Sequence, residues 1–231
     1  MKSIPPFRGP NLLLLVTVHF LLFAAGLVAG SVLRHGAHFA TPFAPAEELR
    51  TFLAVSPAAV RVSNFFLFGS AIPFGIFAVT VVSRLRFLGV RAAGTNIALL
   101  GGLTATTALI LSGSVGWILS VPDVLASAPV VKAISFLNFL LGGAVFAVGF
   151  GLLAAGVSVT CYFMRLLPRW LVALGMLLAL AGEASSLSLV AFPANFFIPI
   201  TRYVGFIWMF AVAIALAKDR QGAQASISDA V

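Results

Sequence analysis

Long continuous runs of apolar residues make up most of this chain, and only short polar segments separate them. Of its 231 residues, 61% are hydrophobic and only 9% are charged. A soluble domain carries roughly 25% charged residues, so this chain lacks the side chains to cover a water-facing surface. Runs of this length indicate helices that cross a membrane rather than helices that cover a soluble core. The sequence therefore predicts an all-α fold, a polytopic transmembrane helical bundle.

We expect six spans in a single transmembrane domain over 1–217. Each run is long enough to cross a hydrocarbon core of about 30 Å at about 1.5 Å per residue. The expected spans are about 11–33, 58–83, 93–120, 129–162, 168–191 and 199–217. A cleaved signal peptide is the competing interpretation of the first run. That run is longer than the roughly 7–15 apolar residues of such a peptide, so we expect a retained helix.

The longest polar segment, 34–56, carries helix signals of its own. Pro45 suits a first helical position, and two glutamates follow it, where they favour a helix start. One face of this helix would carry Leu49, Phe52 and Leu53. We expect a short amphipathic helix that lies on the outer membrane surface. The polar tail, 218–231, is expected to be disordered.

The positive charges are distributed unevenly and predict an orientation. With both termini in the cytoplasm, nine cations lie inside: Lys2, Arg8, Arg84, Arg86, Arg91, Arg165, Arg169, Lys218 and Arg220. Five lie outside: Arg34, Arg50, Arg61, Lys132 and Arg202. An excess of Lys and Arg in short cytoplasmic loops is the usual bias. Because these clusters suit anionic headgroups, the net charge of +8 does not lead us to expect nucleic-acid binding.

Small residues predict where the helices approach one another closely. The first run contains Gly26 and Gly30 in a GxxxG pattern. The fourth contains a longer ladder with a spacing of four: Gly143, Ala147, Gly151 and Ala155. Such faces pack helices in lipid, where the hydrophobic effect does not drive association. The ladder could meet a neighbouring helix or a second copy of the chain.

Polar residues inside the runs define the candidate site. Glu183 is about 20 Å above the inner interface, and Ser186 lies on its face, where it could form a hydrogen bond. Arg202 is expected at a similar depth on the adjacent helix, and Asn138 could extend the pocket. Ionisable groups cost several kcal/mol in a membrane and call for a partner or a purpose. One interpretation is an ion pair between Glu183 and Arg202 or a neutral glutamate; the other is a site for a headgroup, ion, substrate or proton.

His19 is the remaining intramembrane candidate, about 12 Å into the first span. A single membrane histidine is more often a hydrogen-bonded packing residue than a ligand, and the lack of a second one speaks against a haem. We expect no cofactor. His35 and His38 with the glutamates of 47–48 match no familiar metal site, so no metal is expected. The single cysteine, Cys161, allows neither an internal disulfide nor a CxxC motif.

The last third of the chain resembles a known group. LPRW leads into the fifth run, and a P-x-TR-x-x-G-x-x-W segment opens the sixth, formed by Pro199, Thr201, Arg202, Gly205 and Trp208. In these motifs, residues 167–217 resemble the uncharacterised bacterial membrane proteins of the DUF4386-like family. The resemblance implies a six-helix protein of the bacterial cytoplasmic (inner) membrane. It implies no reaction.

These observations favour a non-enzymatic bundle that binds a lipid or small lipophilic molecule, or that serves as a partner subunit in the membrane. The expected partners are the lipid bilayer, a bound lipid, and a second copy or another membrane protein. A proton-coupled transporter that uses Glu183 is the first alternative. A membrane enzyme acting on a lipid is the second, and it would need a catalytic group close to Glu183 or His19.

Overall fold

The structure is a computed structural model that describes residues 9–34 and 40–228, with side chains described up to residue 217. Helices account for nearly all of this part of the chain, and it contains no strand. Six helices are long and apolar enough to cross a membrane: Leu12–Leu33, Pro57–Phe87, Ala93–Ile118, Ala128–Met164, Arg169–Leu189 and Phe192–Ala217. The all-α bundle with six spans is thus confirmed. The largest difference from the predicted boundaries is in the sixth helix, which begins near 192 instead of 199.

Three of these long helices are continuous, and three are built from shorter pieces. The continuous ones are α1 (Leu12–Leu33), α3 (Pro57–Phe87) and α4 (Ala93–Ile118). The fourth joins α6 (Ala128–Leu140) to α7 (Phe146–Met164) through a π-helical turn, η1 (Leu141–Val145). The fifth is α8 (Arg169–Ala184) with the 3₁₀ turn η2 (Ser185–Leu189). The sixth consists of η3 (Phe192–Phe196), α9 (Phe197–Pro199), the π-helical turn η4 (Ile200–Val204) and α10 (Gly205–Ser228).

Capping residues in the sequence fix where several helices begin and end. The Asn11 side chain accepts hydrogen bonds from the amides of Leu13 and Leu14, so it satisfies the first turn of α1. The Ser56 side chain accepts a hydrogen bond from the Ala59 amide at the start of α3, where Pro57 occupies the first helical position. α7 ends at Arg165, whose backbone adopts the left-handed conformation with φ of 53°.

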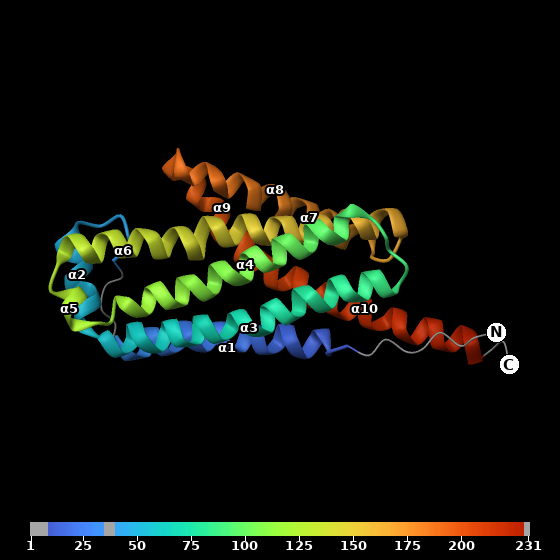
Figure 1. Cartoon of the computed structure of the whole chain (residues 1–231), viewed down its shortest axis with the longest axis horizontal. Helices are drawn as coiled ribbons and strands as arrows, with labels where there is room; N and C mark the ends of the chain where they lie inside the picture. The colour runs from blue at the N-terminus through green and yellow to red at the C-terminus, as the bar shows by residue number, and fades with distance from the viewer. Residues whose placement is uncertain (1–8, 35–39, 229–231) are drawn as a thin grey trace.

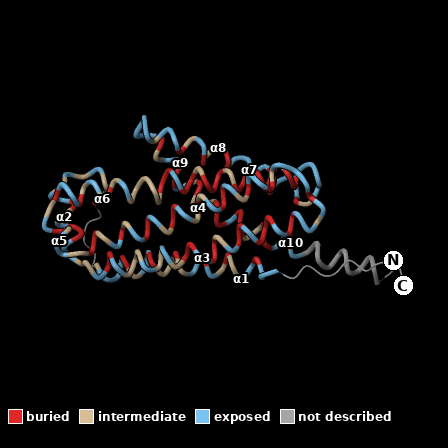
Figure 2. The backbone as a smooth tube through the Cα atoms, in the orientation of Figure 1, coloured by how far each residue is buried: buried red, intermediate tan, exposed pale blue. Residues whose placement is uncertain are grey.

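The long helices lie side by side along the long axis of the molecule (Figure 1). Two short helices, α2 (Ala46–Val55) and α5 (Pro122–Leu125), close one end, and α1 begins and α10 ends toward the other. The hairpin of α8 and α9 projects from the bundle, and its turn stops well short of the end that carries α2 (Figure 1). Buried residues follow the interior of the bundle, whereas exposed ones follow the outward faces (Figure 2).

Helix α7 is the central helix because small residues line two of its sides. On one side, a Cβ on Gly149 would lie 2.6 Å from the Ala105 amide nitrogen of α4. On the other, a Cβ on Gly182 of α8 would lie 2.8 Å from the Gly151 Cα. Gly151 belongs to the ladder predicted from the sequence, so this ladder packs within the chain, against α8. The Gly26–Gly30 pair contacts α3 in the same way, around Ser63.

Helix α2 packs on the rest of the protein. Its apolar face consists of the three residues expected from the sequence, Leu49, Phe52 and Leu53, and all three are buried. They join residues of α3, α5 and α6, among them Val60, in a small core at this end of the bundle. The Arg34 guanidinium stacks over the Phe52 ring at 4.9 Å, and burial lowers the pKa of Arg34 from its usual value. The location at the membrane surface stays a prediction, and the apolar face of α2 is covered by the bundle instead of being left for lipid.

Helix α10 runs to Ser228, so the structure has helix where the sequence predicted a disordered tail over 218–231. Residues 229–231 lie outside the described part. The segment follows directly on a formed helix, so it needs no new nucleation, and Ala, Gln, Lys and Arg are good helix formers. Its low apolar content, which suggested disorder, does not prevent this extension.

Candidate functional site

Arg202 lies in the interior of the bundle, where it connects two interrupted helices. It belongs to the π-helical turn η4, and its Nη2 donates to the backbone carbonyl of Gly142 in the π-helical turn η1. The guanidinium carbon lies 4.6 Å from the centre of the Phe146 ring and 5.4 Å from that of Phe23. The Nε atom is buried and has no hydrogen-bond partner. Arg202 is therefore held by a carbonyl and two aromatic faces, and no carboxylate among the described residues pairs with it.

Asn138 belongs to the same interior region, as expected. Its Oδ1 accepts a hydrogen bond of 2.6 Å from Ser112 Oγ of α4. Ser112 also lies against η1, because a Cβ on Gly142 would meet the Ser112 hydroxyl at 2.5 Å. Arg202 and Asn138 are thus neighbours of one irregular segment and form a polar region that connects α4, α6 and η4. Sequence reasoning did not identify Ser112, because an isolated serine in an apolar run gives no signal.

Glu183 does not belong to this region. It is exposed on α8, and it forms neither the expected ion pair with Arg202 nor any other ion pair with a described residue. Ser186, also exposed, donates to the backbone carbonyl of Glu183 at 2.6 Å instead of to its carboxylate. The predicted pairing fails because Arg202 turns inward to Gly142, whereas Glu183 lies on the outward face of the hairpin. The sequence predicted a similar membrane depth for Glu183 and Arg202, but it did not predict the directions in which their side chains point.

His19 is a buried contact between three helices. Its Nδ1 donates to the backbone carbonyl of Ser70 in α3 at 2.8 Å, and its ring centre lies 5.2 Å from those of Phe74 and Phe206. Pro73 interrupts the hydrogen bonding of α3 close to this carbonyl. The histidine is enclosed by aromatic rings and lies apart from Glu183, so the two do not form a shared catalytic group.

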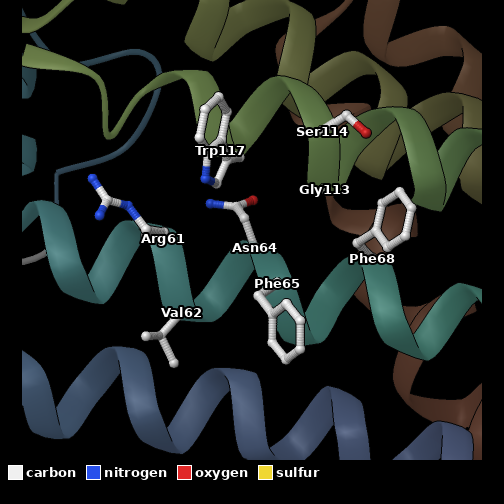
Figure 3. A pocket seen from close by; sticks show the side chains of 8 residues that line it. All are labelled: Arg61, Val62, Asn64, Phe65, Phe68, Gly113, Ser114 and Trp117. Carbon is white, nitrogen blue, oxygen red and sulfur yellow. The ribbon is translucent and has the colours of Figure 1, made fainter.

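A groove opens between α3 and α4 near the end that carries α2, with a volume of about 570 Å³ (Figure 3). Its walls are largely apolar and aromatic: Val62, Phe65 and Phe68 come from α3, and Gly113, Ser114 and Trp117 come from α4. Phe65 and Trp117 are 67% and 48% exposed, which leaves their rings available to a molecule in the groove. A groove of this size and lining suits a hydrocarbon chain.

Two polar side chains, Arg61 and Asn64, lie at the end of this groove nearest α2 (Figure 3). Arg61 is exposed, and its Nε lies 3.5 Å from Ser120 Oγ. No described carboxylate forms an ion pair with it. Asn64 donates to the Val60 carbonyl at 2.8 Å and packs directly on Gly116, where a Cβ would overlap its amide. The groove therefore combines an apolar body with a free positive charge at one end.

This groove was missed in the sequence, although part of the signal was present. Arg61 was assigned to the outer cations, and Asn64 lies one helical turn beyond it. Arg61 and Asn64 lie near Trp117 only because α3 and α4 approach each other closely. The approach is set by Gly113, where a Cβ would lie 2.9 Å from the Phe68 backbone.

Within the described residues, no group of three His, Cys, Asp or Glu side chains could hold a metal, and His35 and His38 lie outside that part.

No protein-family model, curated protein sequence or solved structure matches this chain. The resemblance of residues 167–217 to the DUF4386-like family therefore stays a prediction from their motifs. The observed geometry is the basis for a functional proposal.

Proposed function

We propose that this protein is a non-catalytic membrane protein that binds a phospholipid in the groove between α3 and α4. The observation that carries the proposal is the position of Arg61 at one end of an apolar groove of about 570 Å³. A phospholipid has the same pattern, with a phosphate at one end of hydrocarbon chains. The guanidinium would bind the phosphate, and the groove would hold part of an acyl chain.

The aromatic and charged residues support this placement. Trp is enriched at the level of lipid headgroups, and Trp117 lies near the end of α4, beside Asn64 and on the side of the groove toward Arg61 in Figure 3. Farther from Arg61 along the groove, the lining from α3 is aromatic and consists of Phe65 and Phe68. Because no described carboxylate neutralises Arg61, a phosphate would bring a missing counter-charge.

The orientation and location belong to the same proposal. An outer face at α2, with both termini in the cytoplasm, accounts for the nine inner and five outer cations of the sequence. The groove would then lie in the outer leaflet of a bacterial cytoplasmic membrane. A proton-coupled transporter receives less support, since Glu183 does not line the groove between α3 and α4.

Native mass spectrometry of the purified protein with added phosphatidylglycerol tests the proposal. We expect one tightly held lipid in the wild type and a roughly tenfold weaker affinity in Arg61→Gln, because charge-assisted hydrogen bonds are worth about 1.5–3 kcal/mol. Ser114→Trp, which fills the groove from an exposed position, should also displace the lipid.

Two matched controls separate the groove from general effects. Arg91→Gln removes another exposed cation. Ser31→Trp adds the same bulk at an exposed serine whose hydroxyl, like that of Ser114, donates to the carbonyl four residues earlier at 2.9 Å. If Arg61→Gln and Ser114→Trp hold the lipid as tightly as these controls, the groove is not the site.

A further inference from the structure

Glu183 lies on an exposed apolar face of α8, and no described residue covers that face. The outward side of α8 and η2 carries Leu177, Leu180 and Leu187, which are 63%, 65% and 55% exposed. These positions share one side of a helix with Glu183, which is exposed among them. The opposite side of α8, including Leu171 and Leu178, is buried in the bundle.

The position of the hairpin puts this carboxylate inside the membrane. Glu183 lies about 10 Å from the end of the span Arg169–Leu189, given the rise of a helix. Beyond that span the turn itself is apolar: Val190 and Phe192 are 91% and 61% exposed. The turn also stops well short of the end that carries α2 (Figure 1). The side chains exposed at this turn are apolar and suit lipid better than water, which argues that the carboxylate below it lies within the hydrocarbon.

A carboxylate in hydrocarbon costs several kcal/mol unless it finds a partner. The chain itself provides none among its described residues, because Arg202 turns inward to the Gly142 carbonyl. A second copy packed on the same face would bring two carboxylates together, and residues 170–201 of the hairpin contain no lysine or arginine to relieve the repulsion. A partner with a positive charge removes the cost.

We propose that the Glu183 face of α8 binds a transmembrane helix of another protein, one that carries a lysine or arginine at matching depth. The leucines at 177, 180 and 187 would form the apolar part of the contact, and the carboxylate would select for the cation. This interface is separate from the lipid groove, which lies between α3 and α4. The two proposals can therefore fail independently.

The test uses synthetic single-span peptides in vesicles that contain the full-length protein. One peptide has a leucine–alanine helix with a single lysine in its outer half, and its twin has leucine at that position. Energy transfer from a donor at an introduced cysteine (Arg91→Cys) to a labelled peptide reports association. We expect the wild type to bind the lysine peptide roughly tenfold more tightly than the leucine peptide.

Charge exchange makes the test specific to Glu183. Glu183→Gln should bind the two peptides alike, and Glu183→Lys should prefer a peptide with glutamate in place of lysine. Equal binding of both peptides by the wild type would overturn the proposal, as would a lysine preference that survives in Glu183→Gln. A photoreactive residue at Leu187 that cross-links to a second copy of the chain would also overturn it. Cross-links to a basic transmembrane segment, lost in Glu183→Gln and absent from a probe at Leu100 on α4, would support it.

Discussion

The Nη2 of Arg202 donates to the backbone carbonyl of Gly142, and each of the two residues belongs to a π-helical turn. Such turns have irregular backbone hydrogen bonding and recur at functional or strained places in helices. Here the irregular turn of one long helix supplies an acceptor, and that of another supplies the donor. The contact explains how the cation is accommodated in the bundle although no described carboxylate pairs with it.

Replacement of Arg202 should therefore weaken the fold. We expect Arg202→Ala to lower the free energy of unfolding by about 2–3 kcal/mol, because it removes a charge-assisted hydrogen bond and the contacts with two rings. Arg202→Lys should cost about 1–2 kcal/mol, since an ammonium lacks the planar face that lies over Phe146. Unfolding in mixed micelles, followed by circular dichroism, measures both. Equal stability of Arg202→Ala and the exposed-site control Arg91→Ala would contradict this role.

Glu183 and Arg202 should contribute to stability independently. Glu183→Gln should not lower the free energy of unfolding of the isolated protein, because it removes an unpaired carboxylate from an apolar face and breaks no ion pair with a described residue. In the double variant with Arg202→Ala, the two changes should add within about 0.5 kcal/mol. The same unfolding assay applies. A coupling energy above about 1 kcal/mol would reveal an ion pair that the described geometry lacks.

The fold was predictable because hydropathy alone indicates six helices, and several helix starts are marked by a local signal. Asn11, the Ser56–Pro57 pair and Pro168 lie where α1, α3 and α8 begin. The interior breaks at η1 and η4 were not predictable, because a π-helical turn depends on contacts between helices. The sixth span begins earlier than expected because residues 192–199, which contain two prolines, form short helical turns, η3 and α9, ahead of η4.

The candidate site was predictable as a set of unusual residues but not as an arrangement. Glu183, Arg202, Asn138 and His19 were selected because polar groups are rare in such runs, yet only Arg202 and Asn138 share a region. Which way a side chain points depends on the rotation of each helix about its axis. In a chain this apolar, the sequence has little polar periodicity to set that rotation.

His19 should act in packing rather than in lipid binding. His19→Phe keeps an aromatic ring beside Phe74 and Phe206 but removes the donor to the Ser70 carbonyl. We expect a loss of about 1 kcal/mol in the free energy of unfolding. The affinity for phosphatidylglycerol in the mass-spectrometric assay should not change. A loss of lipid without a loss of stability would instead place His19 at a binding site.

Close packing of α7 and α8 should make Gly182 intolerant of a single methyl group. A Cβ there would lie 2.5 Å from the Ala147 carbonyl oxygen, and backbone atoms cannot move aside without shifting a helix. Gly182→Ala should therefore cost about 2–3 kcal/mol. Gly69→Ala in α3 is the matched control, because nothing lies within 4 Å of its added Cβ. It should be neutral or stabilise by up to about 1 kcal/mol, the difference in helix propensity.

The three tryptophans should report on three environments in a bilayer. Trp208 is fully buried, whereas Trp117 and Trp170 are 48% and 59% exposed. In variants that keep one tryptophan, lipids brominated on their acyl chains should quench Trp117 and Trp170 strongly and Trp208 weakly, because quenching requires close approach. When Arg61→Gln is combined with these variants, quenching of Trp117 should fall at low lipid-to-protein ratios, where only tightly held lipid is present. Quenching of Trp170 should not change. Quenching of Trp208 as strong as that of Trp117 would mean that lipid reaches the interior of the bundle, against the packing described.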